Sequence, residues 1–155
     1  MRLPTGHVLD AVSVGTLPDW AAVLALTDAG EAVLVEQYRY GVDRVGLELP
    51  AGALDAGEDP LDGARRELLE ETGYGGGTWT PLGVVAPEPG RFDSHAHLFV
   101  AQGVTREAAP SLDASEDLVV RRVPAAELPG LAASGAIHHG IHVAAVFWAL
   151  HRGLL

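Results

Sequence analysis

The helix expected over residues 60–72 constrains the fold of this chain most, because both of its ends are marked. Asp59 suits the N-cap position and Pro60 suits the first helical position, where the missing N–H costs nothing. Asp62 adds negative charge to the first turn, which the helix dipole favours. Gly73 then ends the helix on the C-terminal side. The sequence therefore predicts where this helix begins and where it ends.

Three glutamates occupy one side of this helix. Glu67, Glu70 and Glu71 are spaced i, i+3 and i+4, so they share a face beside the apolar stripe that should pack on the core, namely Leu61, Ala64 and Leu68. Carboxylates gathered at the edge of a core repel one another and need a counter-charge, which a hard divalent cation supplies. From the helix alone, an ordinary solvated face paired with arginines is an equally good interpretation.

The rest of the chain predicts a mixed sheet with helices packed on it, in a single domain over residues 1–155. Runs rich in valine, leucine and alanine, separated by turn signals, predict a hairpin and further strands rather than a regular strand–helix alternation. Two helices follow near the C-terminus. The strands are expected over residues 8–14, 20–27, 32–39, 45–49, 79–85, 95–101 and 118–123, and the helices over 125–134 and 136–152.

Composition excludes several classes of protein. The chain has no cysteine, so disulfides, thiolate metal sites and cysteine nucleophiles are impossible. Its net charge is -11 and all of its cations are arginine, which argues against nucleic acid as a partner. No targeting segment and no apolar run long enough for a bilayer is visible, so a cytoplasmic protein without a membrane partner is expected.

A longer motif surrounds the glutamates. From Gly52 the chain continues GALDAGEDPLDGARRELLEETGY, which ends at Tyr74. This string resembles the complete Nudix box of the MutT/Nudix family, and only Tyr74 departs from the usual aliphatic residue. The matching positions are Gly52, Glu58, Arg66, Glu67, Glu70, Glu71 and Gly73. So many fixed positions make an accidental match far less frequent than for a short motif.

The resemblance implies an α+β fold, an α/β/α sandwich whose mixed β-sheet carries a loop–helix–loop. It implies Mg2+, or Mn2+ in its place, held by the Ala51 carbonyl and by Glu67, Glu70 and Glu71. Glu67 and Glu71 are expected to be the more essential ligands, and Glu70 and Glu71 to act in catalysis. Glu58 and Arg66 are expected to pair and hold the loop on the helix, as outer partners of metal ligands do; a weak surface ion pair is the alternative.

Flanking strings resemble the ADP-ribose pyrophosphatase and nucleotide-sugar hydrolase branch. They are Gln37-Tyr38-Arg39 and the run from Leu47 to Gly52. By analogy Arg39 contacts phosphate through its planar fork and Glu48 shapes the site. The alternatives are a surface arginine and a capped edge-strand glutamate.

A proline–glycine loop after the box, with Pro89, Gly90 and Arg91, is a second expected substrate contact. Many ADP-ribose hydrolases carry a glutamate soon after this Pro-Gly, whereas this chain has Asp93. That departure weakens the case for ADP-ribose and leaves a diadenosine polyphosphate or another nucleotide as an alternative substrate.

Glu116, in an acidic segment before a strand, is the candidate general base. A solvated acidic loop is an equally good interpretation, and in that case Glu70 or a metal-bound hydroxide takes the role. The alternative of another class is a nucleotide-sensing module that does not cut its ligand. Such modules usually lose box carboxylates, and here all are present.

Two further expectations concern histidines and assembly. His138 and His142 have a zinc-compatible i, i+4 spacing, but no third ligand is apparent, so a packed helix residue is favoured for His142. Relatives in this branch are commonly homodimers whose N-terminal strands contribute to the neighbouring site. A homodimer is therefore predicted, with residues 1–17 in its interface.

Overall fold

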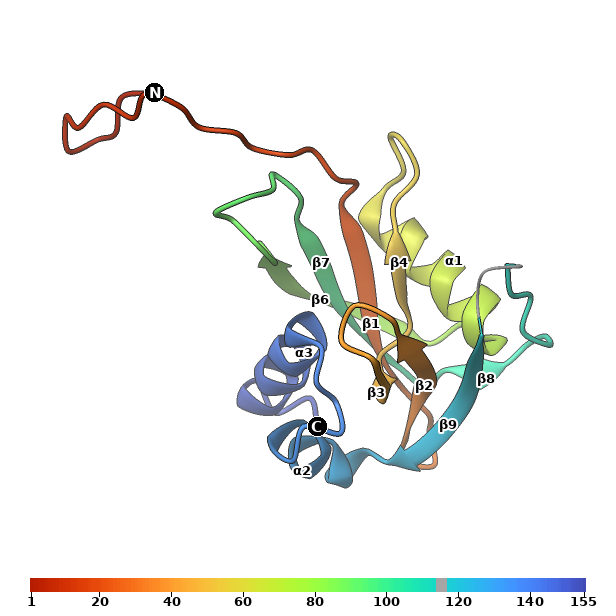
Figure 1. The fold of residues 1–155 in the computed structure, drawn as a ribbon. Coiled ribbons are helices and arrows are strands. Elements are labelled where there is room, and N and C mark those ends of the chain that lie inside the picture. Colours follow the sequence, from red (N-terminus) through yellow and green to blue (C-terminus); the bar gives the residue numbers. More distant parts are fainter. Residues whose placement is uncertain (114–116) are drawn as a thin grey trace.

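The computed structural model describes residues 1–113 and 117–155. At its centre is a seven-stranded mixed sheet with the order β3-β2-β1-β7-β6, in which β4 also pairs with β1 and β9 with β2 (Figure 1). Its strands are β1 (Trp20–Leu26), β2 (Glu31–Arg39), β3 (Arg44–Glu48), β4 (Ala51–Ala53), β6 (Thr78–Val85), β7 (Ala96–Gln102) and β9 (Leu118–Pro124). The short strands β5 (Tyr74–Gly75) and β8 (Thr105–Arg106) pair separately.

Strand β1 is the central strand of the sheet and is buried on both faces. It runs parallel to β7 and antiparallel to β2 and β4, which makes the sheet mixed. Alternate side chains serve two separate apolar clusters: Leu24 points to one and Val23 to the other. Helix α1 (Pro60–Thr72) covers the Val23 face, and helix α3 (Gly140–His151) covers the Leu24 face (Figure 1). The expected α/β/α sandwich is confirmed.

Helix α1 has the ends that the sequence predicts. The Asp59 side chain accepts hydrogen bonds from the backbone N–H groups of Leu61, at 2.9 Å, and Asp62, at 3.4 Å. Gly73 has a φ of 74°, a left-handed conformation that favours glycine, and its N–H caps the Leu69 carbonyl. The two ends of the helix are therefore set by local contacts.

The strand predicted over residues 8–14 is wrong. Before β1 the chain forms only two isolated bridges, Arg2 with Val8 and Gly15 with Phe92. Val12 and Val14 are both exposed, and the arm extends away from the body (Figure 1). A β-branched sequence becomes a strand only where it pairs along a sheet edge, and this arm makes isolated bridges instead of a continuous ladder.

The C-terminal helices are shorter than predicted. Pro129 cannot donate within a helix, and the expected 125–134 helix divides into a 3-10 turn, η1 (Ala125–Glu127), and a short helix, α2 (Leu128–Ala133). The second helix begins at Gly140 rather than 136, because the Ala136 carbonyl accepts a hydrogen bond from the Leu47 N–H at 3.1 Å. No helix in the described ranges is long and apolar enough to cross a bilayer.

Candidate metal-binding and active site

Helix α1 presents two of its three glutamates to the interior. Glu67 is 7% exposed and Glu71 is 4% exposed, beside the fully buried Ala64 and Leu68. Glu70 lies further round the helix, with 45% of its side chain exposed. The prediction that carboxylates sit at the edge of the core therefore holds for Glu67 and Glu71, and the solvated-face interpretation does not describe them.

Arg66 forms ion pairs with several carboxylates of the motif. Arg66 donates to both oxygens of Glu58 at 2.9 Å, to Glu67 at 2.7 Å and to Glu70 at 3.0 Å. Arg66 lowers the pKa of the Glu58 carboxyl to about 2, and a hydrogen bond from the Asp55 N–H adds to the effect. The expected Glu58–Arg66 contact is present, and it ties the loop before α1 to the helix.

The loop before α1 approaches the glutamates through its backbone. The Ala51 N–H donates to Glu71 Oε2 at 3.0 Å. At Gly52 an added Cβ would collide with the Glu67 carboxylate, so any side chain there would displace that carboxylate. Glycine at this position follows from the close approach of the loop backbone to a buried carboxylate.

A second charge pair stands opposite, on β2 and β3. Arg39 Nε donates to Glu48 Oε1 at 2.8 Å and Arg39 Nη2 donates to Oε2 at 2.6 Å, a two-point contact. Glu48 is fully buried, and Gln37 also donates to it at 3.2 Å. Arg39 keeps 34% of its side chain exposed. Both residues are thus held rigidly, with Arg39 at the surface of a cleft.

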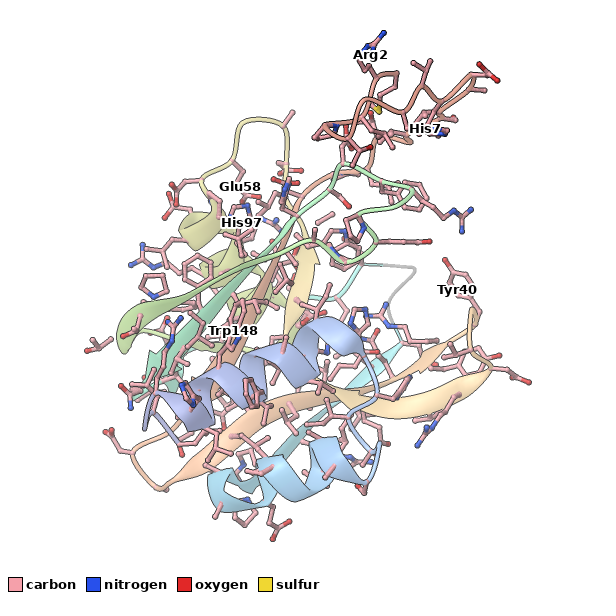
Figure 2. The ribbon with its side chains drawn as sticks, turned by 90° about the vertical axis from the view of Figure 1, so that its left-hand side faces the viewer. Arg2, His7, Tyr40, Glu58, His97 and Trp148 are labelled. Carbon is pink, nitrogen blue, oxygen red and sulfur yellow. The ribbon has the colours of Figure 1, made fainter. Side chains whose placement is uncertain are left out.

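That cleft brings the two groups together in a volume of about 570 Å³. It joins the ends of β2 and β4 to the inner edge of α1. The lining residues are Trp20, Gln37, Tyr38, Arg39, Tyr40, Ala51, Gly52, Ala53, Asp55, Arg66, Glu67, Glu71, Asp113 and Asp117. A larger hollow of about 660 Å³ lies on the other side of the 54–58 loop, where Glu58 and His97 occupy the same end of the molecule (Figure 2).

Sequence reasoning missed the aromatic part of the cleft. Trp20 begins β1, and Tyr40 projects from the turn after β2 with 89% of its surface exposed (Figure 2). The string around Arg39 signalled the neighbourhood of Tyr38 and Tyr40. Trp20 carried no such signal, because only the pairing of β1 with β4 brings it beside Ala53.

The donor set suits Mg2+. It consists of two nearly buried carboxylates, Glu67 and Glu71, with the backbone of Ala51 in the same cleft. Over residues 1–113 and 117–155 no three carboxylate or imidazole side chains already converge as a complete cage. Mg2+ does not require one, since it binds through one or two carboxylates and completes its shell with waters and substrate phosphates.

Other predicted site residues lie elsewhere. Pro89, Gly90 and Arg91 do not line the cleft. Arg91 instead contacts Glu88 at 3.3 Å and stacks over Phe92. Their role in substrate binding stays a prediction. The candidate general base, Glu116, lies outside the described residues.

Within residues 1–113 and 117–155 the histidines do not join a group of three metal-ligating side chains. His142 is 2% exposed and its Nδ1 accepts a hydrogen bond from the Leu49 N–H at 3.3 Å, which agrees with a packed helix residue. His95 and His97 flank the Asp19 carboxylate at 3.7 and 3.4 Å. The His95 backbone N–H donates to that carboxylate and is the main cause of its lowered pKa.

Comparison with known proteins identifies the family. A NUDIX domain model matches residues 17–144. The methanol dehydrogenase activator of Bacillus methanolicus is 44% identical over 100 residues, which cover 64% of this chain and 54% of that protein. The ADP-ribose pyrophosphatase of Mycobacterium tuberculosis (strain ATCC 25618 / H37Rv) is 36% identical over 148 residues, which cover 94% and 71%.

A solved structure agrees with these matches. The crystal structure of an ADP compounds hydrolase has a TM-score of 0.76 and 27% identity, covering 88% of this chain and 75% of that one. The aligned region thus spans little more than half of the Bacillus protein and about three quarters of the solved chain. The motif, the sandwich fold and the matched domain model agree, and the chain belongs to the Nudix family.

Proposed function

We propose that this chain is a Mg2+-dependent pyrophosphohydrolase that cuts a nucleoside diphosphate linked to another group. The observation that carries the proposal is a single cleft lined both by nearly buried carboxylates and by an arginine from β2. Glu67 and Glu71 are nearly buried there, and Arg39 stands on the β2 side. A diphosphate needs both features, because its charge must be neutralised and its oxygens must be oriented.

The metal would be held by Glu67, Glu71 and the Ala51 carbonyl, with Glu70 as a further ligand. Mn2+ would fit the same oxygen donors. A divalent cation there neutralises the diphosphate and makes a water easier to deprotonate. The chain's own residues position the reactants: Arg66 holds Glu67, and the Ala51 N–H orients Glu71. No covalent nucleophile is required.

Arg39 is the proposed phosphate contact. Its Nε and one Nη2 hydrogen are used by Glu48. The remaining N–H groups can therefore serve a phosphate from the exposed edge of the side chain. Glu48 acts by fixing the plane of the guanidinium rather than by touching substrate.

Glu116 remains the proposed general base, with Glu70 and Glu71 as the carboxylates closest to the chemistry. Support comes from the flanking residues Asp113 and Asp117, both of which line the cleft. Replacement of Glu116 by glutamine is expected to lower kcat with little change in Mg2+ affinity.

The proposed substrate is ADP-ribose or a related nucleotide sugar. Support comes from the relative named ADP-ribose pyrophosphatase, which matches 94% of this chain, and from the solved ADP compounds hydrolase. A net charge of -11 argues for a small nucleotide over nucleic acid. We place the enzyme in the cytoplasm as a homodimer, and the exposed valines of residues 1–17 support the dimer.

The test is product analysis of a substrate panel with and without Mg2+. The panel holds ADP-ribose, GDP-mannose, UDP-glucose, NADH, diadenosine tetraphosphate and 8-oxo-dGTP. Metal-dependent release of AMP from ADP-ribose is the expected result. Preference for another compound would keep the mechanism and correct the substrate. Binding of metal and nucleotide without any cleavage would favour a nucleotide-sensing module and overturn the proposal.

A further inference from the structure

We propose that His142 is a positioning residue for the active site, although it belongs to the helix on the opposite face of the sheet. Its hydrogen bond to the Leu49 N–H fixes the segment from Glu48 to Ala51. That segment carries the carboxylate that orients Arg39 and the backbone that meets the glutamates of α1. The inference rests on the proposed function of the cleft and assigns a role to a buried histidine outside it.

The hydrogen bond determines the state of the imidazole. His142 lies in the first turn of α3 with only 2% of its surface exposed, and Nδ1 is 3.3 Å from the Leu49 nitrogen. A backbone N–H can only donate, so Nδ1 must be unprotonated and the proton must reside on Nε2. Burial lowers the pKa of His142 well below its usual value, with smaller contributions from His139 and Arg39. The ring is therefore neutral.

Three successive residues of the segment are each tied to a different layer of the molecule. The helix α3 layer contributes His142, the sheet contributes β1, and helix α1 contributes Glu71. The hydrogen bonds are Leu49 N–H to His142 Nδ1 at 3.3 Å, Val23 N–H to the Pro50 carbonyl at 3.0 Å, and Ala51 N–H to Glu71 Oε2 at 3.0 Å. Loss of the first tie frees one end of the segment and leaves a buried N–H unpaired.

The neutral state of the His142 ring matters because the Arg39–Glu48 ion pair is next to it. Glu48 Oε2 is 3.9 Å from His142 Nδ1, and the two carboxylate oxygens of Glu48 together accept the two-point contact from Arg39. A neutral acceptor aimed at the backbone leaves both carboxylate oxygens to Arg39 and Gln37. His139 stacks on His142 with a centroid distance of 4.5 Å and restrains the ring from the other side. The geometry therefore specifies one orientation of the imidazole.

The competing explanation is that His142 only packs in the core and does not position the active site. Helix α3 contains a residue that serves as a matched control for this. Val146 lies one turn after His142, is also 2% exposed and packs in the core cluster between α3 and the sheet. It has no polar contact with the Glu48–Ala51 segment. A Val146→Ala variant therefore perturbs the core of the same helix without removing a hydrogen bond.

The experiment compares His142→Leu, His142→Asn and Val146→Ala with the wild type at a temperature where all are folded. Leucine removes the acceptor, whereas the asparagine carbonyl can take the place of Nδ1. The readouts are amide hydrogen exchange at Leu49 and Ala51, Mg2+ affinity by calorimetry, and kcat and KM for ADP-ribose. Should His142→Leu fail to fold, His142→Met replaces the imidazole acceptor with a weakly accepting thioether on a more adaptable side chain.

Loss of the acceptor is expected to speed exchange at Leu49 and to weaken Mg2+ binding by about tenfold, the lower end for outer partners of metal ligands. KM should rise through the loosened Arg39. His142→Asn should bind Mg2+ nearly as tightly as the wild type because its carbonyl restores the acceptor, and Val146→Ala should lose melting temperature only. Equal behaviour of His142→Leu and Val146→Ala overturns the proposal, as does failure of asparagine to restore Mg2+ affinity.

Failure of the proposed function is distinguishable from failure of this inference. If the wild type cleaves nothing, Mg2+ affinity and amide exchange still separate the variants. If the wild type also binds no Mg2+, exchange at Leu49 and Ala51 decides alone. Faster exchange in His142→Leu than in Val146→Ala then supports the tie, and equal exchange refutes it.

Discussion

Replacement of Gly52 by alanine tests whether catalysis needs the close approach of the Nudix loop backbone to the Glu67 carboxylate. The backbone of Gly52 is not in the left-handed region, so the substitution tests space alone. An added Cβ would lie 2.5 Å from Glu67 Oε2 and closer to Oε1, where ordinary contacts are at least 3.4 Å. The carboxylate must therefore retreat by about 1 Å, away from the 2.7 Å ion pair with Arg66.

The effect on catalysis follows from that displacement. Misplacement of a reacting group by about 1 Å costs about 100-fold in rate, which corresponds to about 2.7 kcal/mol of transition-state stabilisation. Overpacking of this kind costs about 1–3 kcal/mol of stability. A loss of activity much larger than the loss of folded protein is therefore expected.

The assay measures kcat/KM for the substrate that the panel identifies, at saturating Mg2+, beside a circular-dichroism melt. Gly130→Ala in α2 is the matched control, because nothing lies within 4 Å of a Cβ added there. Gly130→Ala should keep wild-type activity. A Gly52→Ala enzyme within threefold of wild type would refute the assignment of Glu67 to the reacting centre.

Three further predictions follow from the site. Mg2+ should raise the melting temperature of the wild type, since a ligand that binds only the folded state stabilises it by about 2.7 kcal/mol at 100 times its Kd. Glu71→Gln should remove this shift and most activity while the circular-dichroism spectrum stays native. Near-normal turnover of that variant would contradict the ligand assignment. Arg66 lowers the pKa of Glu58 to about 2, so the stability from this pair is present above the ordinary carboxyl pKa of 4.5 and lost as pH falls towards 2. The melting-temperature gap between wild type and Glu58→Gln should therefore close over that range, and a gap unchanged at pH 2 would disprove the pairing. Light scattering should give a dimer mass that deletion of residues 1–14 reduces to a monomer mass, and a monomer peak of the full chain across micromolar concentrations would exclude the dimer.

The sequence alone determined the helix α1 and the chemistry of its face. Asp59 and Gly73 act on neighbouring backbone groups, so their effect does not depend on the rest of the fold. The spacing of Glu67 and Glu71 places both on one side of the helix for the same local reason. The central strands were also predictable, because short apolar runs between turn signals are buried as strands in the middle of a sheet.

Tertiary structure decided everything that depends on a distant partner. The valines of residues 8–14 have strand-forming side chains but find no sheet edge, so they remain an exposed arm. Pairing of β1 with β4 brings Trp20 into the cleft, and the packing of α3 turns His142 towards Leu49. A hydrogen bond between residues about a hundred positions apart leaves no local pattern, and this is why the sequence predicted the Glu58–Arg66 pair beside the glutamates but not the contact of His142 with Leu49.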